Sequence, residues 1–428
     1  MFAISKKTII GGAIGNALET YDYVIWGLFS VYLSKEFLPP QSKLSDIFFL
    51  FLITYVLRPI GGLLGGILAD QIGRKKMLTL SIVLMGICTG LISILPSYQE
   101  IGVISVFLLL LIRLIQVFTV SSEYISSISL LIESCDKKRK GYFGSWAAFG
   151  VNAGMLISSL LGTLLLYLMD IGILPNWGWR IAFCIAFITM LIGFWIRNSL
   201  PESLEFVMKN ARNERRTFYE IIQESVSVLR THFFETIIVF FIVCFGVSAT
   251  ILLFVYAPIH MITFNSLHNT QSFIINSISL VLLTCLVPVF GAMSDTFGRI
   301  KILLIGTATL VLLSIPYFKL LSLGTFSQIL LIDTLIAIPC ASIFAVTPVL
   351  IAEIFPLSVR CSVTNLIYSI AACFGGGITP LIAFKLGNYN PYLPSLILVI
   401  LGLISLSLLS LFLKKQDNVD QSLKLVGY

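Results

Sequence analysis

The sequence predicts an all-α membrane protein with twelve transmembrane helices in two pseudo-symmetric six-helix bundles around a central cavity. Three observations lead to this prediction: the composition, the spacing of the apolar runs, and a repeat between the two halves of the chain. Of the 428 residues, 57% are hydrophobic and only 11% are charged, whereas soluble domains are roughly 25% charged. A bilayer core needs roughly 20 apolar residues per helix, so the chain is long enough for about a dozen spans.

Twelve apolar runs of span length follow one another along the chain. We therefore predict helices near residues 9–33, 46–69, 77–96, 101–132, 143–170, 179–197, 234–260, 271–294, 301–320, 326–353, 362–385 and 391–414. The first run is too long for the apolar part of a signal peptide and contains Glu19 and Asp22, which indicates a span that is retained.

One long polar stretch separates the sixth run from the seventh. It divides the chain into an N-terminal six-helix bundle (1–197), a cytoplasmic linker (198–233) and a C-terminal six-helix bundle with a short tail (234–428). Of the 28 lysines and arginines, 21 lie in connections on the same side as the two termini, and 5 lie on the other side. By the positive-inside rule, both termini and the linker are expected in the cytoplasm.

The motif G-x-x-x-D-x-x-G-R occurs twice, after the second and the eighth runs, and the two copies are 225 residues apart. Its glycines permit a tight turn, its aspartate can bind a helix N-terminus, and its arginine can pair with the end of another helix. One copy alone is equally well an ordinary basic loop, whereas two matching copies favour a latch that stabilises one conformational state. The predicted latch comprises Gly66, Asp70, Gly73, Arg74, Glu133, Arg139, Asp295, Gly298, Arg299, Glu353 and Arg360.

Further motifs extend over nearly the whole chain. They lie at residues 15–23, 58–62, 113–116, 144–146, 177–180, 353–356 and 375–380, together with Glu123 and Arg360. With the repeated motif, they make the sequence resemble the major facilitator superfamily, and within it the metabolite:proton symporter branch of proline/betaine, α-ketoglutarate, shikimate and citrate transporters. The resemblance implies alternating access between the two bundles, and it leaves the substrate open.

Ionisable side chains inside predicted spans are costly in a bilayer and therefore mark candidate functional residues. Glu19 and Asp22 are three residues apart, so we expect them to share a helix face and to compete for one proton. Arg113 is expected to hold one carboxylate ionised and to release it on protonation; the alternative is a permanent ion pair between two helices. Arg58 is interpreted as a partner of a neighbouring helix. The predicted proton-coupling residues are Asp22, Glu19, Arg113 and Glu123.

Arg113 and Asp333 are 220 residues apart and occupy equivalent places in the two halves. We expect them to face the central cavity with opposite charges, which suits a zwitterionic substrate. Asp333 is alternatively a proton-transfer residue, or a residue near a helix end that faces lipid headgroups. The predicted substrate-binding residues are Arg113, Asp333, Tyr23, Trp26, Tyr55, Asn152, Tyr256, Asn365 and Tyr368.

The sequence contains no nucleophile paired with a base, no phosphate-binding loop and no cluster of metal ligands, so we predict neither an enzyme nor a metal site. The expected function is proton-coupled symport of a small polar metabolite or osmolyte, preferably a zwitterion such as proline or betaine. The expected partners are the substrate, the lipid bilayer and the proton, which is the coupling ion in place of any cofactor; nucleic acid is not expected. The protein is expected to act as a monomer in the bacterial cytoplasmic (inner) membrane. Alternatives are a proton symporter of an organic acid such as α-ketoglutarate or citrate, a proton-antiporting efflux protein, and a transport-inactive membrane sensor.

Overall fold

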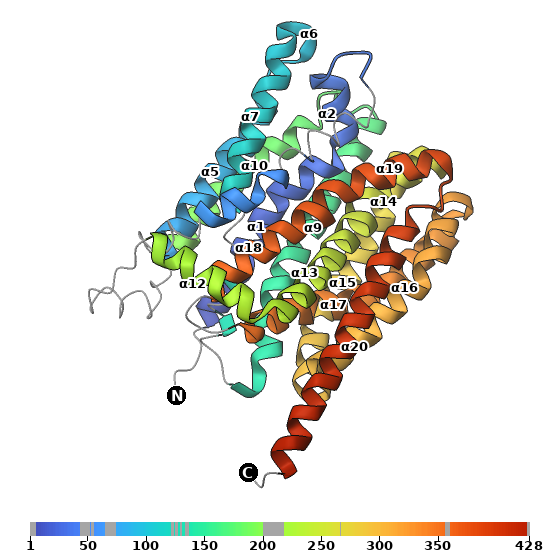
Figure 1. Ribbon diagram of the computed structural model, residues 1–428. Helices are drawn as coiled ribbons and strands as arrows, with labels where there is room; N and C mark the ends of the chain where they lie inside the picture. The colour runs from blue at the N-terminus through green and yellow to red at the C-terminus, as the bar shows by residue number, and fades with distance from the viewer. Residues whose placement is uncertain are drawn as a thin grey trace.

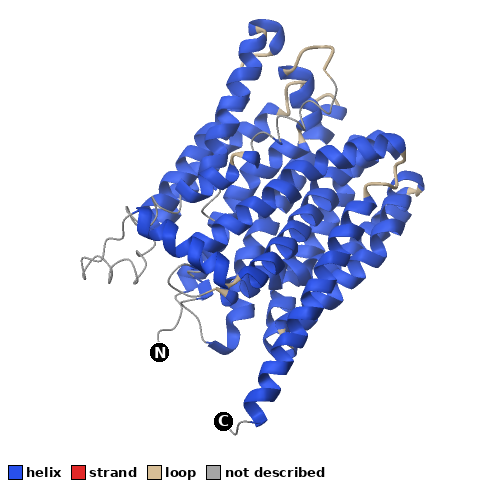
Figure 2. Cartoon of the chain, viewed as in Figure 1, coloured by secondary structure: helices blue, strands red, loops and turns tan. Residues whose placement is uncertain are grey.

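The structure is a computed structural model that describes residues 6–42, 52, 55–64, 74–120, 124, 127–128, 131–132, 137–199, 218–265, 267–355 and 360–425. These residues form helices joined by loops, and they contain no strand (Figure 2). Nine helices in this part of the chain are long and apolar enough to cross a membrane. The predicted all-α membrane fold is confirmed.

The first half begins with a helix that breaks near one end of the bundle. The prediction for residues 9–33 was one helix, but α1 ends at Leu28 and a separate helix, α2, begins at Ser30. Residues 55–64 are helical apart from a turn at Leu57. The remaining helices of this half are α5 (Arg74–Ile94), α6 (Tyr98–Ile101), α7 (Val103–Val120), α9 (Lys140–Asp170) and α10 (Arg180–Ser199), after α1 (Lys6–Leu28) and α2 (Ser30–Phe37).

The second half has the same succession of long helices, two of which contain π-helical segments. The seventh predicted span of the chain consists of α13 (Phe233–Thr250), η2 (Ile251–Tyr256), α14 (Ala257–His260) and η3 (Met261–Asn265) in succession. The eleventh predicted span of the chain consists of α18 (Arg360–Ala372), η4 (Cys373–Ile378) and α19 (Thr379–Tyr389). The others are α15 (Asn269–Phe297), α16 (Arg299–Leu323), α17 (Phe326–Ile354) and α20 (Ser395–Leu425).

Helix boundaries follow local sequence signals. Ser97 and Thr325 begin α6 and α17 with capping boxes, in which the side chains of Glu100 and Gln328 accept hydrogen bonds from the cap backbone at 2.8 and 3.0 Å. Gly298 separates α15 from α16 with φ of +90°, a conformation that favours glycine. The repeated motif therefore has a structural requirement for glycine at this turn.

The predicted linker contains a helix, α12 (Phe218–Thr231), which packs against α13 and α18. In Figure 1, α12 lies toward the end of the bundle at which α1 begins and α20 ends, whereas α6 lies at the opposite end. Both ends of the chain are therefore on one side of the bundle, as twelve spans require. The division into domains at residues 197 and 234 stays a prediction.

Glycines allow α9 to pack closely on α1. A Cβ atom added at Gly150 or Gly154 would collide with the backbone carbonyl of Ala13 or Ala17, respectively. These glycines form a G-x-x-x-G motif, the spacing that brings small residues onto one face of a membrane helix. In the bilayer, where lipid is as apolar as the helix surface, such close contact is a main source of helix association.

We predict that Gly154→Ala destabilises the protein, because the added Cβ collides with the Ala17 carbonyl and forces α1 and α9 apart. Overpacking of this kind costs about 1–3 kcal/mol. The measurement is the midpoint of heat unfolding of the purified protein in detergent. Gly246→Ala in α13 is the matched control, because the nearest atom to its added Cβ, in the Ile343 side chain, is 3.9 Å away. Equal midpoints for the two variants would contradict the close-packing account.

Candidate functional site

A cavity of about 160 Å³ lies between the two halves. The first half contributes side chains from α1, from residues 55–58, from Tyr124 and from α9. The second half contributes side chains from α13, η2, α17 and α18. The described lining residues are Glu19, Thr20, Val24, Tyr55, Arg58, Tyr124, Ala148, Val151, Asn152, Met155, Val243, Gly246, Val247, Thr250, Ile251, Val255, Phe344, Thr347, Pro348, Ile351 and Tyr368.

The described lining carries one carboxylate and one guanidinium group, those of Glu19 and Arg58. The Arg58 guanidinium carbon lies 5.6 Å from the ring centre of Tyr55 and 5.7 Å from that of Tyr368. The Tyr368 ring is in turn 5.5 Å from the ring of Tyr124. Aromatic faces attract cations, and a guanidinium group can bind a carboxylate with two hydrogen bonds. The cavity thus offers partners for both ends of a small zwitterion.

Arg113 lies beside the cavity and is not among its described lining residues. Its guanidinium carbon is 4.3 Å from the ring centre of Trp26, and its Nη1 donates to Gln116 Oε1 at 2.8 Å. Gln116 in turn donates to Thr89 Oγ1 at 2.8 Å, which connects α7 to α5. Tyr55 interacts electrostatically with both Arg113 and Arg58. In this conformation Arg58, and not Arg113, is the arginine that a molecule in the cavity would touch.

The structure separates the two carboxylates of α1. Glu19 lines the cavity, whereas the Asp22 carboxylate lies near Thr189 of α10 and Cys88 of α5. In this conformation the two carboxylates therefore have different surroundings, and competition between Glu19 and Asp22 for one proton stays a prediction. In this conformation Asp22 and Arg113 also contact different residues and not each other. Exchange of partners between them stays a prediction about another state.

Asp333 does not face the cavity, contrary to expectation. It is 1% exposed and lies within the second half, where Ser279 of α15 and Tyr317 of α16 donate hydrogen bonds to its carboxylate. The alternative position near headgroups is also excluded by this burial. The 220-residue offset between Arg113 and Asp333 predicts equivalent positions along the chain, but it does not predict which side of the helix each side chain leaves from. A direct contact between Asp333 and a substrate in the cavity is not supported.

The other predicted substrate-binding residues divide into two groups. Tyr55, Asn152 and Tyr368 line the cavity. Trp26 packs beside Arg113, and the Tyr256 hydroxyl donates to the Ala383 carbonyl at 3.3 Å, while Asn365 is buried in α18. The side chain of Tyr23, and all of Glu123, fall outside the described residues.

Several lining residues were missed by sequence reasoning. Thr20, Tyr124 and Thr347 contribute polar groups to the cavity, and Phe344 contributes a ring. Thr20 adjoins Glu19 and Tyr124 adjoins Glu123, so closeness to a charged residue in a span was the available signal. For Thr347 and Phe344 the sequence gives no such signal.

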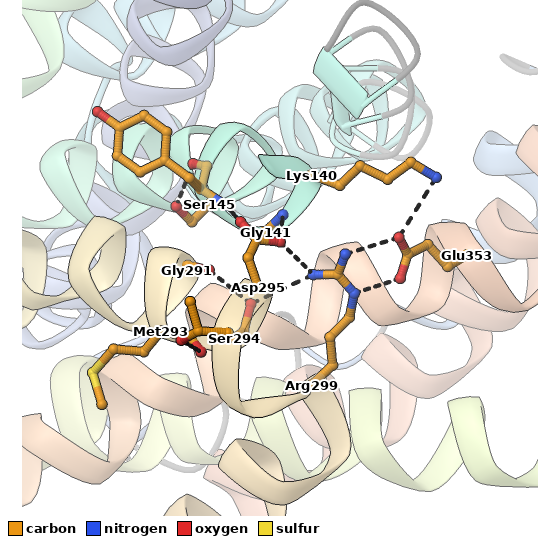
Figure 3. A network of polar contacts seen from close by, with 11 residues as sticks. Lys140, Gly141, Ser145, Gly291, Met293, Ser294, Asp295, Arg299 and Glu353 are labelled. Atoms are coloured by element: carbon orange, nitrogen blue, oxygen red, sulfur yellow. Dashed lines mark hydrogen bonds and ion pairs between the residues drawn. The ribbon is translucent and has the colours of Figure 1, made fainter. Parts of the chain in front are cut away.

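At one end of the cavity, the second copy of the repeated motif joins the two halves (Figure 3). The Asp295 carboxylate, near the end of α15, accepts hydrogen bonds from the backbone N–H groups of Gly141 and Tyr142 at 2.7 and 2.9 Å. These groups belong to the first turn of α9, where the helix dipole favours an anion. The added Cβ of Gly141 would collide with Ser294 Oγ, so glycine permits the approach.

Arg299 extends this network to the end of α17. It donates two hydrogen bonds to the Glu353 carboxylate and lies 3.4 Å from Asp295 Oδ1, and Lys140 Nζ is 3.6 Å from Glu353 Oε1. Three predicted latch residues, Asp295, Arg299 and Glu353, are thus brought together with α9. Gly298 forms the adjoining turn, and Arg139 precedes α9 as an exposed residue. Outside the described residues or side chains are Gly66, Asp70, Gly73, Arg74, Glu133 and Arg360.

The two halves also meet at the other end of the cavity. Thr270 Oγ1 of α15 donates to Asp170 Oδ2 of α9 at 2.5 Å, and His268 Nδ1 is 3.5 Å from the same oxygen. Between the two ends, the hydroxyls of Ser159 and Ser277 are 2.8 Å apart, and Asn276 donates to Ser159 at 3.1 Å. Helices α9 and α15 are therefore in contact along most of their length, with polar contacts near both ends of the pair.

A scan against family models matches residues 13–331 to the Major Facilitator Superfamily. The match covers most of the chain, and the protein belongs to this family. It is therefore a multi-pass membrane transporter that binds a small-molecule substrate, and it is not an enzyme.

Curated relatives match over nearly the full chain. A glycine betaine/proline/ectoine/pipecolic acid transporter, OusA, of Dickeya dadantii is 29% identical over 96% of this chain and 84% of its own. A proline/betaine transporter of Escherichia coli is 28% identical over 94% of this chain and 82% of its own. Among solved structures, the xylose transporter XylE from E. coli, in a partially occluded inward open conformation, superposes with a TM-score of 0.76. It is 19% identical and the match covers 95% of this chain and 97% of that one, so it supports the fold alone.

We predict that Asp295→Asn slows transport without abolishing substrate binding, because it weakens a contact between the halves and leaves the cavity unchanged. An anion at a helix N-terminus contributes on the order of 1 kcal/mol, so the equilibrium between states should shift about fivefold. Transport is measured as uptake into proteoliposomes, and binding is measured by calorimetry.

Glu235→Gln is the matched control for this prediction. It breaks the ion pair with Lys415 at 2.9 Å, which joins α13 to α20 within the second half only. If Asp295→Asn lost binding and transport in equal proportion, or if the control behaved identically, the latch interpretation would fail.

Proposed function

We propose that this protein is a proton-coupled symporter that imports a small zwitterionic osmolyte, such as proline or a betaine, across a bacterial cytoplasmic membrane. Both termini would lie in the cytoplasm, as the lysine and arginine distribution indicates. The observation that carries the proposal is the composition of the cavity, in which Glu19 and Arg58 lie among tyrosine rings between the two halves. The names of the curated relatives support the same substrate class.

The chemistry of the lining fits a zwitterion at both ends. The Arg58 guanidinium can pair with the substrate carboxylate. The faces of Tyr55, Tyr124 and Tyr368 can hold a quaternary or secondary ammonium group, and Glu19 supplies the opposite charge. The apolar side chains of α13 and η2 suit the methyl or ring carbons of such a molecule. A cavity of about 160 Å³ has room for a molecule of this size.

An organic acid with two or three carboxylates is less well accommodated. Each additional carboxylate needs a cation, and Arg58 supplies the cationic side chain among the described lining residues, opposite the anionic Glu19. Import of α-ketoglutarate or citrate is therefore the second candidate. A proton-antiporting efflux protein is third: the largely apolar lining would suit it, whereas Arg58 and Glu19 favour a charged substrate.

Proton coupling is assigned to Glu19, Asp22, Glu123 and Arg113. Glu19 lines the cavity, while Asp22 lies 4% exposed against α5 and α10, behind the cavity wall. A carboxylate buried in this way is costly when ionised and is stabilised by a proton or a cation. Protonation of one of these groups in one state and its release in the other would link the proton gradient to substrate movement.

The proposal predicts uptake of proline or glycine betaine into proteoliposomes that increases several-fold when an inward proton gradient is imposed. Arg58→Gln should reduce substrate affinity at least tenfold, since a charged hydrogen-bonded pair contributes about 1.5–3 kcal/mol. Arg113→Lys should weaken binding less, because Arg113 lies outside the described cavity lining. Uptake of citrate without competition by zwitterions, or gradient-independent uptake, would overturn the assignment.

We predict that Asp22→Asn loses gradient-driven accumulation but retains exchange of substrate across the membrane, because the amide mimics a permanently protonated carboxyl. Glu19→Gln should shift the pH optimum of uptake, a less severe effect than the loss of accumulation in Asp22→Asn. Exchange is measured as counterflow of labelled substrate, and accumulation is measured under an imposed gradient. Thr189→Val, which replaces a polar neighbour of Asp22 with an apolar one, is the companion variant and should alter the pH dependence of uptake. Concentrative uptake by Asp22→Asn at the wild-type level would refute this role.

A further inference from the structure

The carboxylate of Asp333 is buried in the second half with uncharged partners. Ser279 and Tyr317 donate hydrogen bonds to it, the latter to Oδ1 at 2.7 Å. Among the described residues, the titratable groups near it are Tyr317 of α16 and Cys340 of α17, and no lysine, arginine or histidine forms an ion pair with it. A buried carboxylate without a cation is expensive to keep ionised, so a proton is a natural ligand for it.

Tyr317 connects this carboxylate to the helix that lines the cavity. Its hydroxyl is 2.7 Å from Asp333 Oδ1 and 3.5 Å from the backbone carbonyl oxygen of Leu253. Leu253 belongs to η2, whose residues Ile251 and Val255 line the cavity. A hydroxyl has one hydrogen to donate, so the carboxylate and the carbonyl compete for it.

Two carbonyls of η2 receive side-chain donors from outside the helix, and Pro258 limits the backbone donors open to them. Pro258 has no backbone N–H. The Phe254 carbonyl, four residues earlier, therefore lacks its α-helical partner, and the Leu253 carbonyl, five residues earlier, lacks its π-helical partner. Both carbonyls receive side-chain donors instead. Asn276 of α15 donates to the Phe254 carbonyl at 3.2 Å, and Tyr317 of α16 is the donor to that of Leu253.

We propose that Asp333 is a proton-binding site of the second half, and that its protonation transfers the Tyr317 hydrogen bond from the carboxylate to the Leu253 carbonyl. When Asp333 is ionised, Tyr317 donates to Oδ1. When Asp333 takes up a proton from solvent, the new carboxyl O–H donates to the Tyr317 oxygen, and the Tyr317 hydrogen turns to the carbonyl. No covalent bond other than the carboxyl O–H forms, and none is broken.

This switch acts where the halves touch. Val255 of η2 packs against α1 so closely that a Cβ at Gly27 would collide with its side chain. Protonation of Asp333 therefore stabilises the segment of η2 that contacts the first half and the cavity. A proton and a substrate that both depend on this segment affect each other's binding reciprocally. The consequence for transport rests on the proposed symport, whereas the proton site itself does not.

The first test is infrared difference spectroscopy of the purified full-length protein between alkaline and acidic pH, without substrate. The wild type should gain a band from a protonated carboxyl group that Asp333→Asn lacks. Ser314→Ala removes another buried hydroxyl of α16, one that bonds only the Leu310 carbonyl, and should keep the band. An identical carboxyl band in Asp333→Asn and wild type would overturn the proposal.

The second test is amide hydrogen exchange of residues 251–265, expressed as protection factors at pH values on both sides of the infrared transition. One hydrogen bond corresponds to about fivefold in protection, so the wild type should be about fivefold more protected when Asp333 is protonated. Tyr317→Phe should remove this pH dependence and shift the carboxyl band, which keeps the proposal testable if Asp333→Asn does not fold.

His260 is the histidine of this helical run and needs its own control. Its ring bonds Ser322 at 3.0 Å and Tyr256 at 3.5 Å, one turn beyond η2. His260→Gln should retain the pH-dependent protection. If His260→Gln abolished it and Tyr317→Phe did not, the switch would belong to the histidine and the proposal would be wrong. Neither measurement requires transport, so failure here is distinguishable from failure of the symport proposal.

Discussion

The contact between α9 of the first half and α15 of the second half determines how the rest of the molecule is arranged. Glycine and serine side chains allow the two helices to approach along their length, and polar contacts fasten both ends of the pair, at Asp295 and at Asp170. The cavity lies between these fastened ends. Because lipid gives little hydrophobic driving force between helices, a few hydrogen bonds and small-residue contacts suffice to hold or release one end. The two ends are chemically different, so they can open separately.

The high cost of charge in a bilayer explains where the remaining polar groups lie. Glu19 and Arg58 are found where the halves enclose a cavity, and Arg113 is covered by Trp26 and hydrogen-bonded to Gln116. Asp333 is satisfied by hydroxyl groups alone. The first pair is positioned to meet a molecule in the cavity, whereas the buried groups lie behind its walls. In the proposed symport, these buried groups are the ones that would respond to protons.

The long helices and the latch were predictable from the sequence, because span length and a repeated motif are properties of the chain itself. Asp295, Arg299 and Glu353 do meet at one end of the bundle. The direction of a side chain around its helix was not predictable, since apolar residues surround nearly every membrane helix and leave no clear polar face. For that reason the sequence did not indicate that Glu19 and Asp22 have different surroundings, that Asp333 lies away from the cavity, or that Arg58 and not Arg113 lines it. The π-helical segments were not predictable from the sequence either, although Pro258 follows η2.

The central claim is that the two ends of the α9–α15 contact open alternately around the cavity. Paired spin labels measure this directly, with one pair at Arg139→Cys and Phe297→Cys and another at Ile171→Cys and Gln271→Cys, all at exposed positions, in a protein whose native cysteines are replaced. On addition of glycine betaine at acidic pH, the account predicts that one distance lengthens while the other shortens or stays short. Simultaneous lengthening of both, or no change in either under conditions that support uptake, would contradict it.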